Sequence, residues 1–125
     1  MRFRILTYNI HKCLGGLDRR CKPDRIAEAI GHYAPDIVLL QEVVSPALGH
    51  RHDRQVDVLG DLLGYRHRAF FPHISRRGGI DYGNAVLSRW PITDSHQIDL
   101  TMPFLKKRAV VHARIRLTPA LGRPR

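Results

Sequence analysis

The sequence predicts a single-domain protein of the α/β (α+β) class, and three observations support this class. A short apolar run at residues 37–40 has the uninterrupted pattern of a strand that is covered on both faces. Two other segments carry apolar side chains at helical spacing. Residues 108–117 alternate between apolar and polar side chains, which is typical of a strand with one face in water. A length of 125 residues suits one domain.

The first forty residues are predicted to form a strand, a helix and a second strand. Residues 2–8 are rich in strand-favouring side chains, whereas the glycines and charges of residues 11–22 indicate a loop. Pro23 marks the start of a helix and residues 34–36 (APD) its end. The apolar face of this helix is predicted to hold Ile26, Ala29, Ile30 and Tyr33. A right-handed crossover would make the two strands parallel.

The rest of the chain is predicted to add one helix and four strands. A polar loop at residues 45–54 leads to a second amphipathic helix that ends at Gly64 and has its apolar positions at Val56, Leu59 and Leu63. The four strands are expected at residues 66–71, 82–88, 92–100 and 108–117. An irregular tail at residues 118–125 follows a domain that spans residues 1–117.

Basic side chains outnumber acidic ones, with 21 Lys and Arg against 11 Asp and Glu and a net charge of +10. Most are arginines, and one planar guanidinium group can bind two phosphate oxygens at once. A phosphate-bearing partner such as nucleic acid is therefore expected. Because the basic residues form only short clusters, a solvated basic surface without a partner is an equally good interpretation.

Composition also excludes some protein classes. The longest uncharged apolar run, residues 37–40, is far shorter than the roughly 20 residues that a membrane span needs. The N-terminus lacks the apolar region and the cleavage site of a signal peptide. Cys13 and Cys21 cannot complete a tetrahedral zinc site alone, and we expect two reduced thiols in a cytoplasmic protein rather than one disulfide.

Polar residues follow both of the strands that are predicted to be parallel. Asn9 comes just after the first strand, and Glu42 comes just past the apolar run. Ligands of open α/β sheets bind outside the carboxyl ends of parallel strands. A carboxylate attached to so apolar a segment needs a partner, and a hard divalent cation would supply one. The alternative is that Glu42 enters a polar loop and caps the next segment.

A third candidate is Asn84, in the segment DYGN at residues 81–84, which follows the segment RRGG at residues 76–79. The glycines allow close approach of the backbone, and an Asn at the start of a strand can hold a phosphate or another loop. The alternative is a tight turn. No histidine pair has metalloprotease spacing, and Ser88 lacks the GxSxG pattern, so nucleophilic hydrolase chemistry is unsupported.

Three ordered segments resemble the endonuclease/exonuclease/phosphatase (DNase I-like) superfamily. They are LTYNIH at residues 6–11, DIVLLQEV at residues 36–43 and YGNAVLSRWPI at residues 82–92. The resemblance implies the N-terminal half of a two-sheet α/β sandwich, with a mixed sheet and helices on one face. It also implies Mg²⁺- or Mn²⁺-dependent hydrolysis of a phosphoester by a phosphodiesterase or nuclease-like enzyme.

By this resemblance, Glu42 would bind the metal and Asn9 would orient the metal or the phosphate. Asn84 and Tyr82 would lie at the edge of the cleft, near the substrate phosphate, and the segments after Asn9 and at residues 76–79 would border that cleft. The motifs of the family's second half, which bring the remaining carboxylates and the catalytic histidine, do not occur in this sequence. Asp94 and Asp99 are aspartates of this chain, but the residues around them do not match those motifs. The domain is therefore expected to be truncated.

The sequence leaves open what the chain does by itself. We expect little or no catalysis, because metal, carboxylates and histidine act as a unit. The alternative is a non-catalytic basic module that binds nucleic acid or another phosphate-rich surface. Half of a two-sheet sandwich should also expose an apolar sheet face, through which self-association is expected.

Overall fold

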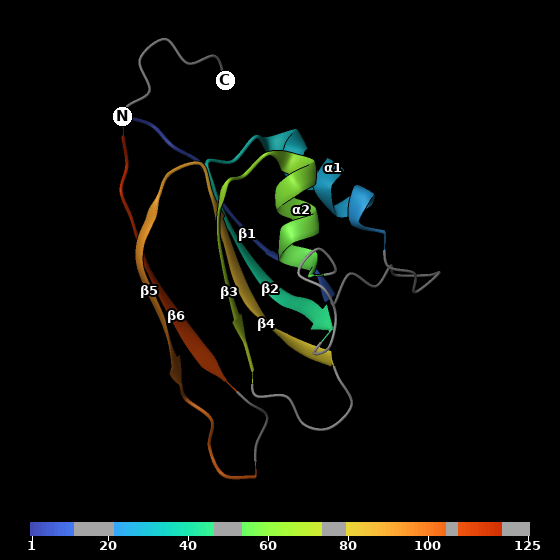
Figure 1. The fold of residues 1–125 in the computed structure, drawn as a ribbon, viewed down its shortest axis with the longest axis vertical. Helices are drawn as coiled ribbons and strands as arrows, with labels where there is room; N and C mark the ends of the chain where they lie inside the picture. The colour runs from blue at the N-terminus through green and yellow to red at the C-terminus, as the bar shows by residue number, and fades with distance from the viewer. Residues whose placement is uncertain (12–21, 47–53, 74–79, 105–107, 119–125) are drawn as a thin grey trace.

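The computed structural model describes residues 1–11, 22–46, 54–73, 80–104 and 108–118. These residues form two helices and six strands (Figure 1). In chain order they are β1 (Ile5–Asn9), α1 (Pro23–Tyr33), β2 (Ile37–Pro46), α2 (Gln55–Leu63), β3 (His67–Pro72), β4 (Ile80–Ser88), β5 (Ile92–Asp99) and β6 (Ala109–Ile115). The order of elements is the predicted one, and the mixed α/β class is confirmed. Both cysteines lie outside the described residues.

The strands form two sheets. The larger has the order β1-β2-β4-β3, with β1 and β2 parallel, as predicted, and the other two pairings antiparallel. The smaller sheet is the antiparallel pair of β5 and β6. Gly83 is required where β4 passes β3, because a Cβ there would overlap the backbone oxygen of Phe71.

Both helices end where the sequence predicts. Ala34 closes α1 in a left-handed conformation, with its N–H donating to the carbonyl of Gly31, and Gly64 closes α2 in the same way. The predicted buried face of α1 is partly wrong, because Ala29 and Tyr33 are exposed. The buried side chains are instead Ile26, Ala27 and Ile30. The face of α1 that contacts the sheet is therefore rotated slightly from the predicted one, and the last turn of the helix extends beyond the core.

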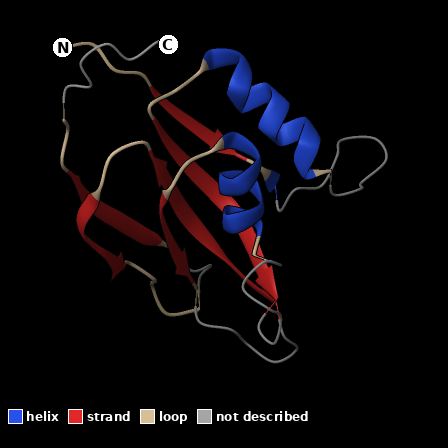
Figure 2. Cartoon of the chain, turned by 45° about the horizontal axis from the view of Figure 1, so that its top comes forward, coloured by secondary structure: helices blue, strands red, loops and turns tan. Residues whose placement is uncertain are grey.

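The chain is arranged in three layers, with the helices on one face of the four-stranded sheet and the β5–β6 hairpin on the other (Figures 1 and 2). The core beneath the helices includes Ile30, Val38, Leu40, Leu59 and Leu87. The second core joins the sheet to the hairpin through Ile37, Val86, Trp90, Val111 and Ala113. The inner side chains of β6 alternate with exposed ones, which confirms the predicted wet face.

The hairpin covers only part of the sheet face that it packs on. Ala69 and Phe71 of β3 contact it. On the β1–β2 side, by contrast, Ile5 is 56% exposed and Leu39 is 36% exposed. The expected exposed apolar surface therefore lies over β1 and β2. Among the described residues, no helix has the length and apolar content needed to cross a membrane.

Candidate functional site

The site is organised by a β-bulge in the middle of β2. Leu40 pairs with Ala85, but the next pair along β2 joins Val43 to Gly83, so two residues of β2, Gln41 and Glu42, oppose the single residue Asn84. Glu42 has a φ of 55°, a left-handed conformation that few residues other than glycine adopt. Bulges and such strained residues concentrate next to functional sites because both redirect a side chain.

Asn9 lies on the other side of this bulge. It pairs with Gln41 in the parallel ladder of β1 and β2, which the Ile10 N–H extends by donating to the Gln41 carbonyl over 3.1 Å. The Asn9 Oδ1 accepts a hydrogen bond of 2.9 Å from the His11 N–H. This short turn fixes the amide of Asn9 at the end of the strand and leaves its oxygen a second lone pair.

Asn9 and Asn84 share the sheet face that is turned away from the helices. The alternation along β4 puts Asn84 on the same face as Val86, which belongs to the core between the sheet and the hairpin. The cross-strand partner of Asn84 on β3 is Phe71, which packs against that core too. Asn9 is exposed because the hairpin does not reach β1, whereas Asn84 is half-buried. Both amides therefore border the open part of this face.

Tyr82 lies two residues before Asn84 on β4 and so points to the same face. Its side chain is 39% exposed, and its ring meets the His73 ring edge-on with the centroids 5.2 Å apart. The four predicted site residues thus belong to three adjacent strands.

The spacing of the strands suits a small ligand. Neighbouring strands lie about 4.7–4.9 Å apart, so the backbones at Asn9 and Asn84 are separated by roughly 9–10 Å with the bulge between them. Within the described part of the chain, the Glu42 carboxylate and the Asn84 amide have no hydrogen bond or ion pair. Carboxylate and amide oxygens are the donors that Mg²⁺ and Mn²⁺ prefer.

Two positional predictions are wrong. Glu42 does not lie past the end of its strand, because β2 continues to Pro46 beyond the bulge. Asn84 is neither at the start of a strand nor in a tight turn, because β4 begins at Ile80. The longer pairing of β2 with β4 produces both differences. The segments at residues 12–21 and 76–79, which were expected to border the cleft, lie outside the described residues.

A second cluster of polar side chains was not predicted. Asp94, His96 and His112 are exposed, and each offers one possible metal-ligand atom, all within 4.8 Å of one another. The alternation of residues 108–117 placed His112 on a wet face, but its partner on β5 depends on the register of the hairpin. Asp99 is not part of this cluster, and its Oδ1 accepts the Thr101 N–H over 2.8 Å.

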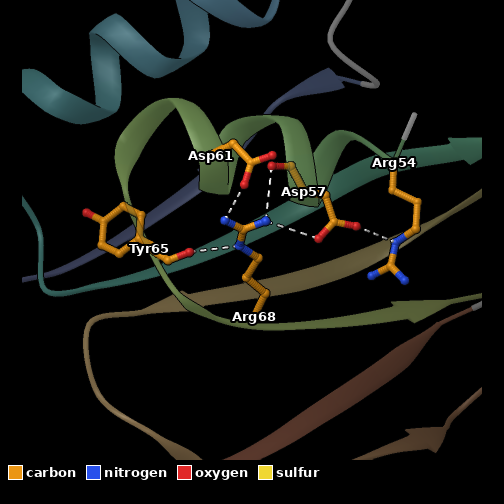
Figure 3. A network of polar contacts seen from close by, with 5 residues as sticks. All are labelled: Arg54, Asp57, Asp61, Tyr65 and Arg68. Carbon is orange, nitrogen blue, oxygen red and sulfur yellow. Dashed lines mark hydrogen bonds and ion pairs between the residues drawn. The ribbon is translucent and has the colours of Figure 1, made fainter. Parts of the chain in front are cut away.

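Several charged residues act in the fold instead (Figure 3). The Arg68 guanidinium lies 3.2 Å from Asp57 Oδ1 and 2.7 Å from Asp61 Oδ1, and its Nε donates to the Tyr65 carbonyl over 2.7 Å. Arg54 Nε lies 3.2 Å from Asp57 Oδ2, an ion pair without hydrogen-bond alignment. The Asp57 side chain is only 7% exposed, so this network neutralises a buried carboxylate between α2 and β3.

A smaller network joins the start of β2 to the end of β4. Asp36 is buried, accepts the Arg4 N–H over 2.8 Å and lies 3.5 Å from Arg89 Nε. Tyr65 donates its hydroxyl to the Pro35 carbonyl. Burial raises the pKa of this phenol above 10.0, with Arg89 acting in the opposite direction. Arg54, Arg68 and Arg89 are thus structural residues, which lowers the number of basic groups free to meet a phosphate.

Residues 6–120 match the model of the Endonuclease/Exonuclease/phosphatase family. The chain is also 30% identical over 133 aligned residues to the uncharacterized protein YbhP of Escherichia coli (strain K12), an alignment that covers 97% of this chain and 49% of YbhP. The chain therefore spans about half the length of the curated relatives that it matches.

Two solved structures share the fold. One is an endonuclease/exonuclease/phosphatase from Beutenbergia cavernae DSM 12333, with a TM-score of 0.75 and 30% identity over 92% of this chain and 34% of that one. The other is an endonuclease/exonuclease/phosphatase family protein from Leptotrichia buccalis C-1013-b, with a TM-score of 0.72 and 22% identity over 91% of this chain and 50% of that one.

Proposed function

Because this chain belongs to the endonuclease/exonuclease/phosphatase family, we propose that it forms one wall of the active site of a metal-dependent phosphoester hydrolase. The observation that carries the proposal is the bulge that holds Glu42 between Asn9 and Asn84. A carboxylate on a strained backbone, without a protein partner among the described residues, is typical of a group reserved for a ligand.

The donor set fits Mg²⁺ or Mn²⁺. Glu42, Asn9 and Asn84 offer oxygen ligands, the hard type that these ions prefer. When bound, the ion would stabilise the developing charge on the phosphoryl oxygens. We assign Glu42 and Asn9 to the metal.

Asn84 and Tyr82 are proposed to hold the substrate. The Asn84 amide can donate to a phosphate oxygen, and the exposed Tyr82 ring borders the same face. The substrate class is a phosphodiester or phosphomonoester. We expect little or no turnover from these 125 residues alone, because Glu42 is the single carboxylate among the residues assigned to the site, and the metal, carboxylates and histidine of such a site act as a unit.

The two glutamates of the chain make a matched pair for the test. Glu42 lies in the bulge, and Glu28 is exposed on α1, remote from the site. Mn²⁺ binding is measured by electron paramagnetic resonance for the parent chain, Glu42→Gln and Glu28→Gln. We expect Glu42→Gln to weaken binding at least about tenfold, since even groups behind the ligands contribute 10–100-fold, and Glu28→Gln to leave it unchanged. Equal binding by all three chains would overturn the proposal.

Turnover is assayed separately with bis(p-nitrophenyl) phosphate and Mn²⁺. Robust hydrolysis that Glu42→Gln abolishes would support the assigned site and contradict our expectation that these residues alone are inactive. Hydrolysis that survives Glu42→Gln would contradict the site itself.

The net charge of +10 supports a second candidate, a non-catalytic module that binds nucleic acid. Exposed arginines that remain outside the ion pairs described above include Arg114 and Arg116 of the hairpin region. Such binding would weaken steeply with salt and would be unaffected by Glu42→Gln. Absence of binding to DNA and RNA at low salt would remove this candidate.

A further inference from the structure

The outer face of the β5–β6 hairpin carries a cluster that the proposed active site does not use. Asp94 and His96 belong to β5 and His112 to β6, and all three are exposed. The neighbours of His112 along β6, Val111 and Ala113, point the other way and pack against the larger sheet. The hairpin itself therefore separates this cluster from Glu42.

The register of the hairpin brings the cluster together. His96 and His112 are direct cross-strand partners, and their rings stack with centroids 4.9 Å apart and an interplanar angle of 29°. Asp94 lies two residues before His96 and so shares its face. Backbone pairing thus holds His112 on the same surface as Asp94 and His96, which lie 16 or more residues earlier in the chain.

The distances suit a shared metal ion. The three possible ligand atoms lie within 4.8 Å of one another. In a tetrahedral zinc site with bonds of about 2.0–2.1 Å, ligand atoms lie about 3.4 Å apart. Each pair must therefore close by no more than about 1.4 Å, which small rotations of exposed side chains can supply.

The three side chains are also available as ligands. Among the described residues, neither the Asp94 carboxylate nor the two imidazoles has a hydrogen bond or ion pair. The cross-strand partner of Asp94 is Arg114, a cation that no ion pair holds against the carboxylate in the described part of the chain. Its charge opposes binding of a metal ion.

We propose that Asp94, His96 and His112 form a binding site for a divalent metal ion of intermediate hardness, and that Zn²⁺ is the ion they bind best. Two imidazoles and one carboxylate suit zinc, whereas Mg²⁺ prefers oxygen ligands alone. The ion would join β5 to β6 as a clip, and the fourth coordination position would face water. This site is independent of the proposed hydrolase function.

Zinc binding by the 125-residue chain is measured by isothermal titration calorimetry. The background is Cys13→Ser/Cys21→Ser, because thiolates are strong zinc ligands. We expect a one-to-one complex in which His96→Gln and His112→Gln each raise the dissociation constant at least about tenfold. Arg114→Gln should lower it, because a repelling charge is removed. The matched control His32→Ala, an exposed histidine of α1, should leave it unchanged.

Two further measurements separate this site from the other one. Glu42→Gln and an excess of Mg²⁺ should leave the zinc affinity unchanged, and saturating Zn²⁺ should raise the melting temperature of the parent chain but not of His96→Gln. The proposal is overturned if no zinc binds, if binding survives both histidine substitutions, or if Mg²⁺ competes with it.

Discussion

Asn84 of β4 lies opposite the two-residue bulge of β2 that contains Glu42. An extra residue in one strand of an antiparallel pair bends that strand and turns a side chain out of the regular alternation. Val43 consequently stays in the core beneath the helices although it is three residues after Leu40. The bulge turns the half-buried Glu42 out of the regular alternation of side chains without ending the strand.

Substitution of Glu42 by glycine should separate stability from function. Glycine adopts a φ of 55° freely, whereas other residues lose about 1–2 kcal/mol there, and the greater entropy of glycine in the unfolded chain offsets about 0.5–1 kcal/mol of that gain. We expect the free energy of unfolding in urea to be unchanged or raised by up to about 1.5 kcal/mol, with Mn²⁺ affinity lost.

Glu28→Gly is the matched control, because Glu28 is exposed within α1 and glycine there costs about 1 kcal/mol. If both glycine variants are destabilised equally, backbone strain at Glu42 is refuted.

Asp57→Asn should destabilise the chain by about 3 kcal/mol, because it removes the buried partner of the partly buried Arg68 and leaves only the exposed Asp61 to neutralise it. Asp61→Asn removes a contact with the same guanidinium, but the Asp61 side chain is 72% exposed, so we expect a loss below about 1 kcal/mol. Chemical denaturation of both variants measures the contrast. Similar losses at the two positions would show that burial of Asp57 does not decide the strength of this network.

Tyr65 should make stability fall at alkaline pH. Burial raises the pKa of its phenol above 10.0, so the folded chain keeps a proton that the unfolded chain has lost. The free energy of unfolding is unaffected by this group below about pH 10 and falls as the pH rises from there through the native pKa.

Denaturant unfolding of the parent chain and Tyr65→Phe between neutral and alkaline pH isolates this contribution. At neutral pH the free energy of unfolding of Tyr65→Phe should be about 1 kcal/mol lower than that of the parent chain, because the hydrogen bond to the Pro35 carbonyl is lost. This difference between the two chains should shrink as the pH rises. A constant difference across the range would contradict the raised pKa.

Ile5→Lys should reduce self-association. Ile5 is 56% exposed beside Leu39 on the sheet face that the hairpin leaves open, and β1 is an edge strand of its sheet. Sedimentation velocity at increasing concentration should show association of the parent chain and a shift toward monomer for Ile5→Lys. Leu62→Lys, at a 50% exposed position on α2, is the control that should behave as the parent does. A parent chain that stays monomeric throughout would disprove this role of the open face.

The elements were predictable where their signals are local. Pro23 and Ala34 mark the two ends of α1 through backbone chemistry that acts within one turn. The apolar run at residues 37–40 forms the predicted strand, but the expected covering of both its faces is incomplete, because Leu39 is 36% exposed. Asn9, Glu42 and Asn84 are candidates because of their places beside predicted strands, whereas Tyr82 and the roles of all four residues rest on the resemblance to the family. The register puts these residues on adjacent strands.

The features that escaped prediction depend on register and tertiary packing. The bulge is defined by how β2 pairs with β4, and no local pattern in residues 40–43 specifies that pairing. The contact between His96 and His112 depends in the same way on the register of the β5–β6 hairpin. The contact between Arg68 and Asp57 depends on how β3 packs against α2. A count of basic residues cannot show that Arg68 neutralises a buried carboxylate.

The place of β1 at the edge of the four-stranded sheet has a dynamic consequence. Only β2 holds it within the sheet, whereas β2 and β4 each have strands on both sides. Local opening should therefore release β1 first, and its backbone amides should exchange with deuterium sooner than those of β4. Asn9 would then be the ligand whose position is least fixed before a metal binds, and protection of β1 against exchange would report occupancy of the site.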